Sequence, residues 1–354
     1  MEVLVPGDGR LRSEFARFAR VRSLEYSALT VPSGPAAWIA AVRRVGREIR
    51  TLRAAIQDAA PDLVIITSAL LPTALMAART KGAHSILYAG EILDEPRVAS
   101  RPRALAGRAL LRLAARTATA IVACSDRVGR QYTARSANVT TIHPPIGPRY
   151  AEGDGERFRR DHGIQAGARL IVAVGALTHG RGQDVLIRAV PALRRSHPEI
   201  HLAIVGEPHP RDVDREYAQE IGRLAADLAP GAVTFTGFEE RVEDAYAAAA
   251  VVVNPTRYEA FGRVAFEALL ASRPVVSTSA GAVPELLRDG EDALLVPVDD
   301  SGALAGAVAR ILDDRDLAGR LADAGRARVR AELTPAGSLA RFRATVLASV
   351  KVAQ

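Results

Sequence analysis

The sequence is poor in cysteine and in long apolar segments, and both shortages exclude classes of protein. Cysteine occurs once, at Cys124, so neither a disulfide framework nor a cysteine metal site can form. No apolar run approaches the ~20 residues that cross a bilayer, and the first residues lack the pattern of a signal peptide. We therefore expect a cytoplasmic protein from a reducing compartment.

Aromatic residues make up only 5% of the chain, and lysine occurs only at Lys81 and Lys351. Because no stacking motif accompanies the arginines, we do not expect binding to nucleic acid. Residues 1–150 hold 22 Lys and Arg against 11 Asp and Glu, whereas the remainder holds 25 against 29. This asymmetry indicates either two domains with different partners or arginine-rich helices with solvated faces.

The chain contains a repeated alternation of short apolar runs and helix-length stretches. With 354 residues it is long enough for two domains. Apolar runs such as "DLVIITS", "LIVAVGA" and "AVVVNPT" are typical of parallel strands that are covered on both faces. The series pauses at the proline-rich "TTIHPPIGPRY". The sequence therefore predicts an α/β protein with two doubly wound domains, joined by a linker around Pro144, Pro145 and Pro148.

Two glutamates bracket a Phe-Gly pair in "RYEAFGRVAFEALL", directly after an apolar strand that ends at Asn254 and Pro255. Ligands of doubly wound sheets bind beyond the carboxyl ends of strands. We expect a helix from Gly262 or Arg263 to Leu270, whose first N–H groups can hold a phosphate. Glu259 and Glu267 are then either sugar-binding carboxylates on both sides of a diphosphate or ordinary surface glutamates.

The segment from Asn254 to Asp300 resembles the donor-binding segment of the retaining GT-B glycosyltransferases, the glycosyltransferase family 4-like or group 1 enzymes. The resemblance covers residues 169–333. It is carried by an ordered series of motifs: Glu259, Phe261-Gly262, Glu267, Pro274-Val275-Val276, Gly281, Pro284-Glu285 and Asp289-Gly290. The first half of the chain is similar only in its pattern of strands.

The resemblance implies a GT-B fold, in which two Rossmann-like domains face each other across a cleft. Residues 1–147 would bind the acceptor, and a C-terminal helix at 335–354 would pack back on that domain. Residues 148–334 would bind the nucleotide sugar. In that domain Glu267 would bind the ribose, Glu259 the transferred sugar, and the backbone from Phe261 through Gly262, Arg263 and Val264 the phosphate.

The sequence departs from the family in the loop that normally reaches the diphosphate with an Arg and a Lys. Ala176 replaces the Arg, and Arg181 replaces the Lys. Arg181 can still neutralise phosphate because its planar fork suits two oxygens, and His179 adds a donor when it is protonated. We expect the base near Glu207 and Phe238.

The first half departs from the family as well. Gly7 and Gly9, separated by Asp8, are either the family's nucleotide-binding glycine loop or plain turn glycines. Glu91, with Asp94 nearby, stands where the family commonly has a histidine that faces the transferred sugar. Glu91 either takes over that role or is a carboxylate at a helix start.

The resemblance implies a retaining hexosyltransferase that moves a sugar from a UDP- or GDP-sugar to a hydroxyl acceptor, such as a polysaccharide, glycolipid or natural-product intermediate. No metal or cofactor is expected, because electrostatic stabilisation of the leaving diphosphate supplies the catalysis. The pairs Asp299-Asp300 and Asp313-Asp314 are interpreted as helix caps away from the phosphate site.

The helix-length stretches 38–56 and 101–116 combine arginines with apolar residues at helical spacing. They predict either peripheral contact with the inner face of a membrane and a lipid-linked acceptor, or helices that are packed on the sheet with solvated arginines. Two other functions stay open. One is a catalytically inactive nucleotide-sugar-binding subunit. The other is a Rossmann dehydrogenase, which would need a third glycine that "PGDGRL" lacks.

Overall fold

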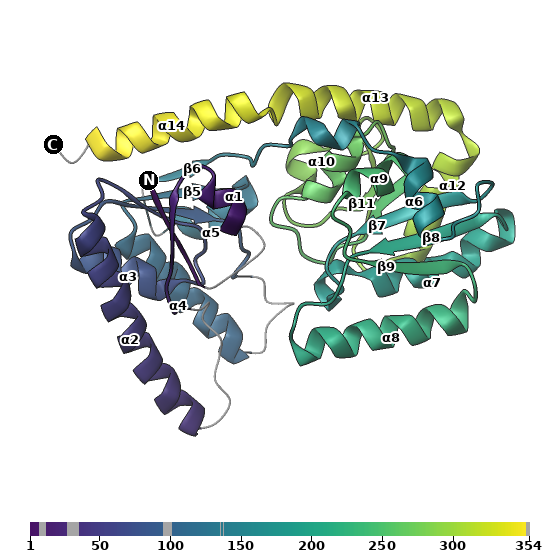
Figure 1. The fold of residues 1–354 in the computed structure, drawn as a ribbon. Helices are drawn as coiled ribbons and strands as arrows, with labels where there is room; N and C mark the ends of the chain where they lie inside the picture. The colour runs from purple at the N-terminus through teal and green to yellow at the C-terminus, as the bar shows by residue number, and fades with distance from the viewer. Residues whose placement is uncertain (7–11, 27–34, 95–100, 135, 137, 352–354) are drawn as a thin grey trace. The chain divides into compact units, whose positions relative to one another are not determined.

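The computed structural model describes residues 1–6, 12–26, 35–94, 101–134, 136 and 138–351. By its contacts the chain divides into two units (Figure 1). Unit 1 comprises residues 1–142 and 340–354, and unit 2 comprises residues 143–339. The sequence had placed the boundary at residues 147 and 148.

Unit 1 is built on a four-stranded parallel sheet in the order β3-β4-β5-β6. Strands β4 and β5 are almost completely buried, as expected from their continuous apolar sequences. The strands are β3 (Val64–Ile66), β4 (Ser85–Ala89), β5 (Ala120–Ala123) and β6 (Val139–Thr141). The helices are α1 (Arg12–Ala16), α2 (Pro35–Ala59), α3 (Pro72–Thr80), α4 (Arg101–Thr117) and α5 (Asp126–Thr133).

The first strand, β1 (Glu2–Val5), does not join that sheet but pairs in parallel with β2 (Arg20–Ser23). The sequence did not predict β2 or β6. Two of the four residues of β2 are arginines, and β6 is short and only partly buried, so neither has the apolar run that marks a buried strand. The hydroxyl of Tyr26, three residues after β2, donates to the Leu4 carbonyl in β1 at 2.7 Å.

Unit 2 contains a six-stranded parallel sheet in the order β12-β11-β10-β7-β8-β9. The strands are β7 (Arg169–Val174), β8 (Ile200–Val205), β9 (Val233–Gly237), β10 (Val251–Asn254), β11 (Val275–Thr278) and β12 (Leu294–Val296). The chain starts in the middle of the sheet and reverses direction between β7 and β10. In doubly wound sheets this topological switch point, at the carboxyl ends of the strands, is where ligands bind.

Helices cover both faces of this sheet (Figure 1). The main core packs α7, α8 and α12 on one face, with fully buried Leu186, Ile221 and Val308. The helices of unit 2 are η1 (Pro148–Ala151), α6 (Gly155–Asp161), η2 (His179–Arg181), α7 (Gln183–Ser196), α8 (Asp212–Leu228), α9 (Val242–Ala248), α10 (Arg263–Leu270), α11 (Val283–Leu286), α12 (Ser301–Asp313) and α13 (Arg315–Glu332).

The last helix, α14 (Pro335–Lys351), contributes to both units. In unit 1 its Phe342 and Val346 pack against a buried cluster of β4, β5 and Ile142. At its other end Ser338 donates to the His143 carbonyl at 2.9 Å. Within the described ranges no helix is long and apolar enough to cross a bilayer.

The expected acidic caps are confirmed for one member of each pair. Asp300 accepts from the Ala303 N–H at the start of α12, and Asp314 accepts from the Leu317 N–H at the start of α13. The interpretation of the other members is wrong. Asp313 pairs with His197, and Asp299 pairs with Arg257 in the loop after β10, so Asp299 does not lie away from the switch point.

Candidate functional site at the topological switch point

Helix α10 begins as the sequence predicts. Its N-cap is Gly262, in the left-handed region with φ of 104°. The first N–H groups of the helix, those of Arg263 and Val264 among them, have no acceptor within the helix. The aligned peptide dipoles add a partial positive charge at this end. The loop after β10 therefore presents an anion-binding helix start directly at the switch point.

The backbone of this loop is held by a glycine on the neighbouring connection. Gly281 has φ of 55°, and a Cβ placed on it would lie 1.7 Å from the carbonyl oxygen of Glu259. The Ala282 N–H donates to that same carbonyl at 3.1 Å. Only glycine fits this contact, so the position of Glu259 depends on the turn after β11.

Both glutamates are buried, and the interpretation of them as surface residues is wrong. Glu259 is 7% exposed and Glu267 is 6% exposed. One oxygen of Glu259 accepts from Arg181 at 2.9 Å, and the other accepts from the Phe261 N–H at 3.3 Å. Buried carboxylates need such partners because desolvation of a charge is costly. Arg181 and Glu259 thus form an ion pair between the loops after β7 and β10.

Glu267 is held by two donors of different kinds. The hydroxyl of Tyr246 on α9 donates to one oxygen at 2.9 Å, and Arg263 lies 3.0 Å from the other. Burial, followed by the neighbouring charge of Glu267, raises the pKa of Tyr246 well above its usual range, so this phenol remains a donor. Arg263 also donates to the Pro145 carbonyl at 3.2 Å.

The loops after β7 and β10 touch through their backbones. A Cβ on Gly182 would lie 2.1 Å from the Pro255 carbonyl oxygen. The carbonyl of Gly180 accepts from the Arg257 N–H at 2.8 Å and from the Thr256 hydroxyl at 3.0 Å. The short helix η2, which carries His179 and Arg181, is therefore fixed against the segment that leads to Glu259.

Arg257 is a member of this site that sequence reasoning missed. Its guanidinium binds both oxygens of Asp184 at 2.8 Å and an oxygen of Asp299 at 2.5 Å. Burial alone would raise the pKa of Asp184, but the hydrogen bonds from Arg257 and Tyr217 outweigh it and lower that pKa. In the sequence Arg257 looks like any exposed arginine before a Tyr-Glu pair.

The remaining residues predicted for unit 2 lie at the ends of neighbouring strands. Phe238 follows β9 and is 53% exposed, and the Glu207 carbonyl after β8 accepts from the Leu177 N–H at 3.1 Å. Ala176 follows β7, and its carbonyl accepts from the Gln183 amide at 3.0 Å. The rings of His179 and Tyr217 make an edge-to-face contact, with their centroids 5.9 Å apart.

In unit 1, Glu91 directly follows Gly90 at the end of β4, and its side chain is hydrogen-bonded to the residues that follow β3. Its carboxylate accepts hydrogen bonds from the Ser68 hydroxyl, from the Ala69 N–H at 3.5 Å and from the Gly90 N–H at 3.2 Å. Residues 91–94 are not helical, so the interpretation of Glu91 as a helix-start carboxylate is wrong. The nearby Asp94 pairs with Arg127 at 2.8 Å. Gly7 and Gly9 lie outside the described residues.

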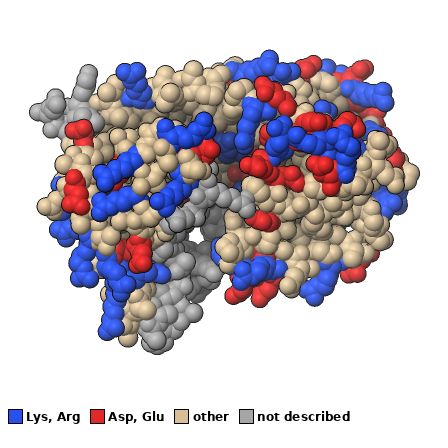
Figure 2. Space-filling view, in the orientation of Figure 1, with Lys and Arg blue, Asp and Glu red and all other residues tan. Residues whose placement is uncertain are grey.

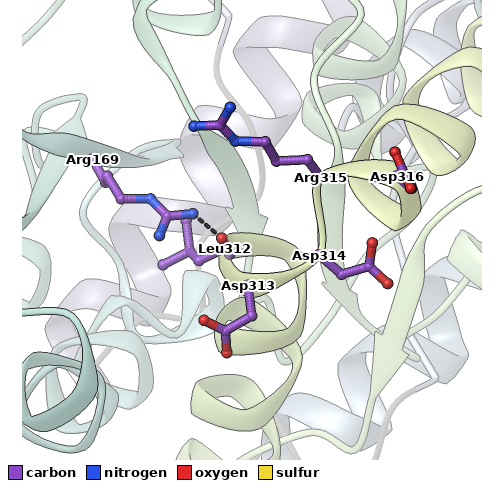
Figure 3. Close-up of a pocket in the computed structure, with 6 residues that line it drawn as sticks. All are labelled: Arg169, Leu312, Asp313, Asp314, Arg315 and Asp316. Atoms are coloured by element: carbon purple, nitrogen blue, oxygen red, sulfur yellow. Dashed lines mark hydrogen bonds between the residues drawn. The ribbon is translucent and has the colours of Figure 1, made fainter.

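A pocket of about 640 Å³ lies elsewhere in unit 2, between the end of α12 and the start of α13 (Figure 3). Arg169, the first residue of β7, reaches across it and donates to the Leu312 carbonyl. It is lined by Arg169, Leu312, Asp313, Asp314, Arg315 and Asp316. Because it lies at the amino end of β7, it is not part of the switch-point site. Across the described segments, no three His, Cys, Asp or Glu side chains gather as metal ligands.

Comparison with known proteins shows what the segment that carries this site is similar to. Residues 168–314 match the family described as "Glycosyl transferases group 1". The D-inositol 3-phosphate glycosyltransferase of Acidothermus cellulolyticus is 32% identical over 213 residues, which are 54% of this chain and 47% of that protein. An uncharacterized glycosyltransferase of Methanocaldococcus jannaschii is 34% identical over 159 residues, covering 44% of this chain and 39% of that protein. The chain thus matches less than half the length of these relatives.

Solved structures extend the likeness to the whole chain. Anabaena Alr3699/HepE, in complex with UDP and glucose, superposes with a TM-score of 0.82 at 20% identity, over 98% of this chain and 91% of that one. Sucrose-phosphate synthase of Thermosynechococcus elongatus superposes with a TM-score of 0.77 at 21% identity, over 94% of this chain and 84% of that one. The fold is therefore GT-B, with two Rossmann-like units. The match of residues 168–314 to the group 1 glycosyltransferases confirms the resemblance seen in the sequence.

The glycine after β11 provides a stability test of this geometry. Gly281→Ala should lower the free energy of unfolding by more than about 2 kcal/mol, because the new methyl group overlaps the Glu259 carbonyl at a positive φ. Gly222→Ala in α8 is the control, since a Cβ there meets nothing within 4 Å and helix propensity favours alanine. Thermal unfolding of both variants is the measurement. Equal melting temperatures would contradict the close approach of the two loops.

Proposed function

We propose that the chain transfers a hexose from a nucleoside diphosphate sugar to a hydroxyl acceptor. The observation that carries this is the arrangement of two buried carboxylates, Glu259 and Glu267, on either side of the Gly262 helix start at the switch point. A helix start suits a diphosphate, and buried carboxylates suit sugar hydroxyls. A nucleotide sugar has the same order of groups: ribose, diphosphate, hexose.

In this proposal Glu267 binds the ribose, and the N–H groups at Gly262, Arg263 and Val264 bind the diphosphate. Arg181 leaves Glu259 for the phosphate when the donor binds, and Glu259 then accepts from hydroxyls of the transferred sugar. Negative charge grows on the leaving diphosphate in the transition state, where Arg181 and the helix start stabilise it. These two sources of positive charge support a metal-independent reaction, and the family resemblance supports retention of the anomeric configuration.

UDP-sugars are the first donors to test, followed by GDP-sugars. Support for UDP comes from the similar fold of Anabaena Alr3699/HepE, which was solved with UDP-glucose. Phe238, exposed beyond β9, and the Glu207 backbone beyond β8 are proposed to contact the base.

For the acceptor, we propose that Glu91 orients the attacking hydroxyl from unit 1. The hydrogen bonds from Ser68, Ala69 and Gly90 hold its carboxylate in a fixed position at the ends of β3 and β4, where ligands of parallel sheets bind. The alternative is a nucleotide-sugar-binding subunit without activity, favoured by Ala176 in place of a second phosphate cation. Release of nucleoside diphosphate from a bound donor separates the two functions.

Unit 1 also offers a basic surface for a membrane-bound acceptor. Helices α2, α3 and α4 are neighbours, and over unit 1 most charged side chains on the face in Figure 2 are Lys or Arg. Their exposed cations include Arg43, Arg47, Arg50, Arg79, Arg108, Arg112 and Arg116. Exposed apolar Ile39, Val42 and Leu105 lie in the first halves of α2 and α4. This combination supports peripheral binding to anionic lipids at the inner face of a membrane, and a lipid-linked acceptor.

The donor site is tested by binding of UDP to the whole chain in isothermal titration calorimetry. Glu267→Ala should weaken UDP binding at least tenfold, because ribose hydroxyls lose a charged acceptor worth more than about 1.4 kcal/mol. Glu267→Gln, which keeps an acceptor for Tyr246, should fold like the wild type and still bind weakly. Glu291→Ala on the exposed turn after α11 is the control. Unchanged affinity in Glu267→Gln and Glu267→Ala would contradict the ribose role.

Turnover tests the role of Arg181. Arg181→Ala should reduce kcat roughly a hundredfold, or about 3 kcal/mol, since a contact that strengthens in the transition state is lost. Arg181→Lys should recover part of the rate because its charge remains while the fork is lost. Steady-state kinetics with the best donor of a UDP-, GDP-, ADP- and dTDP-sugar panel is the measurement. An Arg181→Ala protein within threefold of the wild type would mean that the diphosphate is held elsewhere.

The membrane proposal is tested by sedimentation with vesicles. The wild type should bind vesicles that contain phosphatidylglycerol, fail to bind pure phosphatidylcholine, and lose most binding in 0.5 M salt because charge attraction is screened. Arg43→Gln with Arg47→Gln should weaken binding severalfold. The same two changes at Arg215 and Arg223 on α8 should not. Equal binding by both double variants would contradict a role for unit 1.

A further inference from the structure

Arg257 is tied to three separate elements of unit 2, although it lies in a loop. It stands between the end of β10 and Glu259, and its side chain is only 9% exposed. The guanidinium reaches Asp184 in the first turn of α7, Asp299 in the connection from β12 to α12, and the carbonyl of His179 in η2 at 2.6 Å. A planar group with five donors is well suited to hold three acceptors at once.

Arg257 and Asp184 stabilise each other in their charged forms. Hydrogen bonds from the guanidinium to Asp184 raise the pKa of Arg257, and they help to lower the pKa of Asp184. Tyr217 adds a further hydrogen bond to Asp184 at 2.8 Å. Loss of Arg257 would leave the Asp184 carboxylate, whose side chain is only 14% exposed, without its cationic partner.

The contacts of Arg257 help to fix the orientation of η2. Its side chain binds the carbonyl of His179, while its own N–H binds the carbonyl of Gly180. In a trans peptide the N–H points opposite to the carbonyl, so Arg257 restrains both peptide planes of η2, and the Thr256 hydroxyl restrains the second one as well. Arg181 follows immediately, and its side chain then reaches Glu259 two residues beyond Arg257.

Asp299 provides an independent sign that the arrangement is maintained against a local cost. It adopts φ of 63°, in the left-handed region that residues other than glycine rarely occupy. Such strain persists where surrounding contacts enforce it, and it clusters at functional sites. The side chain of Asp299 accepts the 2.5 Å hydrogen bond from Arg257, which ties this strained residue to the loop after β10.

We propose that Arg257 is a positioning residue for donor turnover, which acts by fixing η2 so that Arg181 meets the leaving diphosphate. This rests on the proposed glycosyltransferase function. Arg257 itself touches neither the donor nor the acceptor. Its effect on rate is therefore transmitted through Arg181.

The test is a double-mutant cycle on the full chain, with Arg257→Lys, Arg181→Ala and the double variant. Arg257→Lys keeps the charge and loses the fork, so the protein still folds with a lower melting temperature. We expect kcat to fall at least about tenfold in the wild-type background, because misplacement of a stabilising group by about 1 Å is costly. In the Arg181→Ala background the same change should cost less than about threefold.

Arg328→Lys is the matched control, because Arg328 also bridges two carboxylates, those of Asp292 and Glu332, but on α13. It should lower the melting temperature while leaving kcat and donor KM unchanged. Equal losses of kcat from Arg257→Lys in both backgrounds, or an equal loss of kcat in Arg328→Lys, would overturn the proposal. Failure of the wild type to bind UDP or turn over any donor would instead overturn the proposed function.

Discussion

The site depends on the close approach of the loops that follow β7 and β10. Gly182 lies against the Pro255 carbonyl, and two carbonyls of η2 are bonded to Thr256 and Arg257. Parallel pairing of β7 with β10 brings the two loops to one edge of the sheet, and the glycines allow their backbones to meet. Without this contact Arg181 and Glu259, which are 78 positions apart in the sequence, would not form a pair.

Every charged side chain named at this site has a partner of opposite charge within the protein before any ligand binds. Arg181 pairs with Glu259, and Arg263 pairs with Glu267. Arg257 pairs with both Asp184 and Asp299. Donor binding by the proposed scheme therefore exchanges the partner of Arg181, from the Glu259 carboxylate to the diphosphate. The more exposed member of the first pair is Arg181. It can move to the phosphate, while Glu259 stays fixed by Phe261 and the turn at Gly281.

The sequence was sufficient to predict the parts of this site that obey local rules. Strand ends and helix starts are encoded locally. The apolar strand, the Phe-Gly turn and the apolar periodicity therefore predicted α10, with Glu259 in the loop before it and Glu267 within it. It could not reveal Arg257 or Tyr246, whose importance arises from partners on other elements. It also missed β2 and β6, since arginines and a three-residue strand carry no apolar signal.

We infer that a nucleoside diphosphate occupies the switch point of unit 2. A crystal structure of the full chain with UDP tests this most directly. We expect the ribose hydroxyls to lie within hydrogen-bond distance of Glu267. We expect the diphosphate to lie between Arg181 and the first turn of α10, with the Arg181–Glu259 pair opened. UDP bound at the Arg169 pocket, or at the switch point with its ribose away from Glu267, would contradict it.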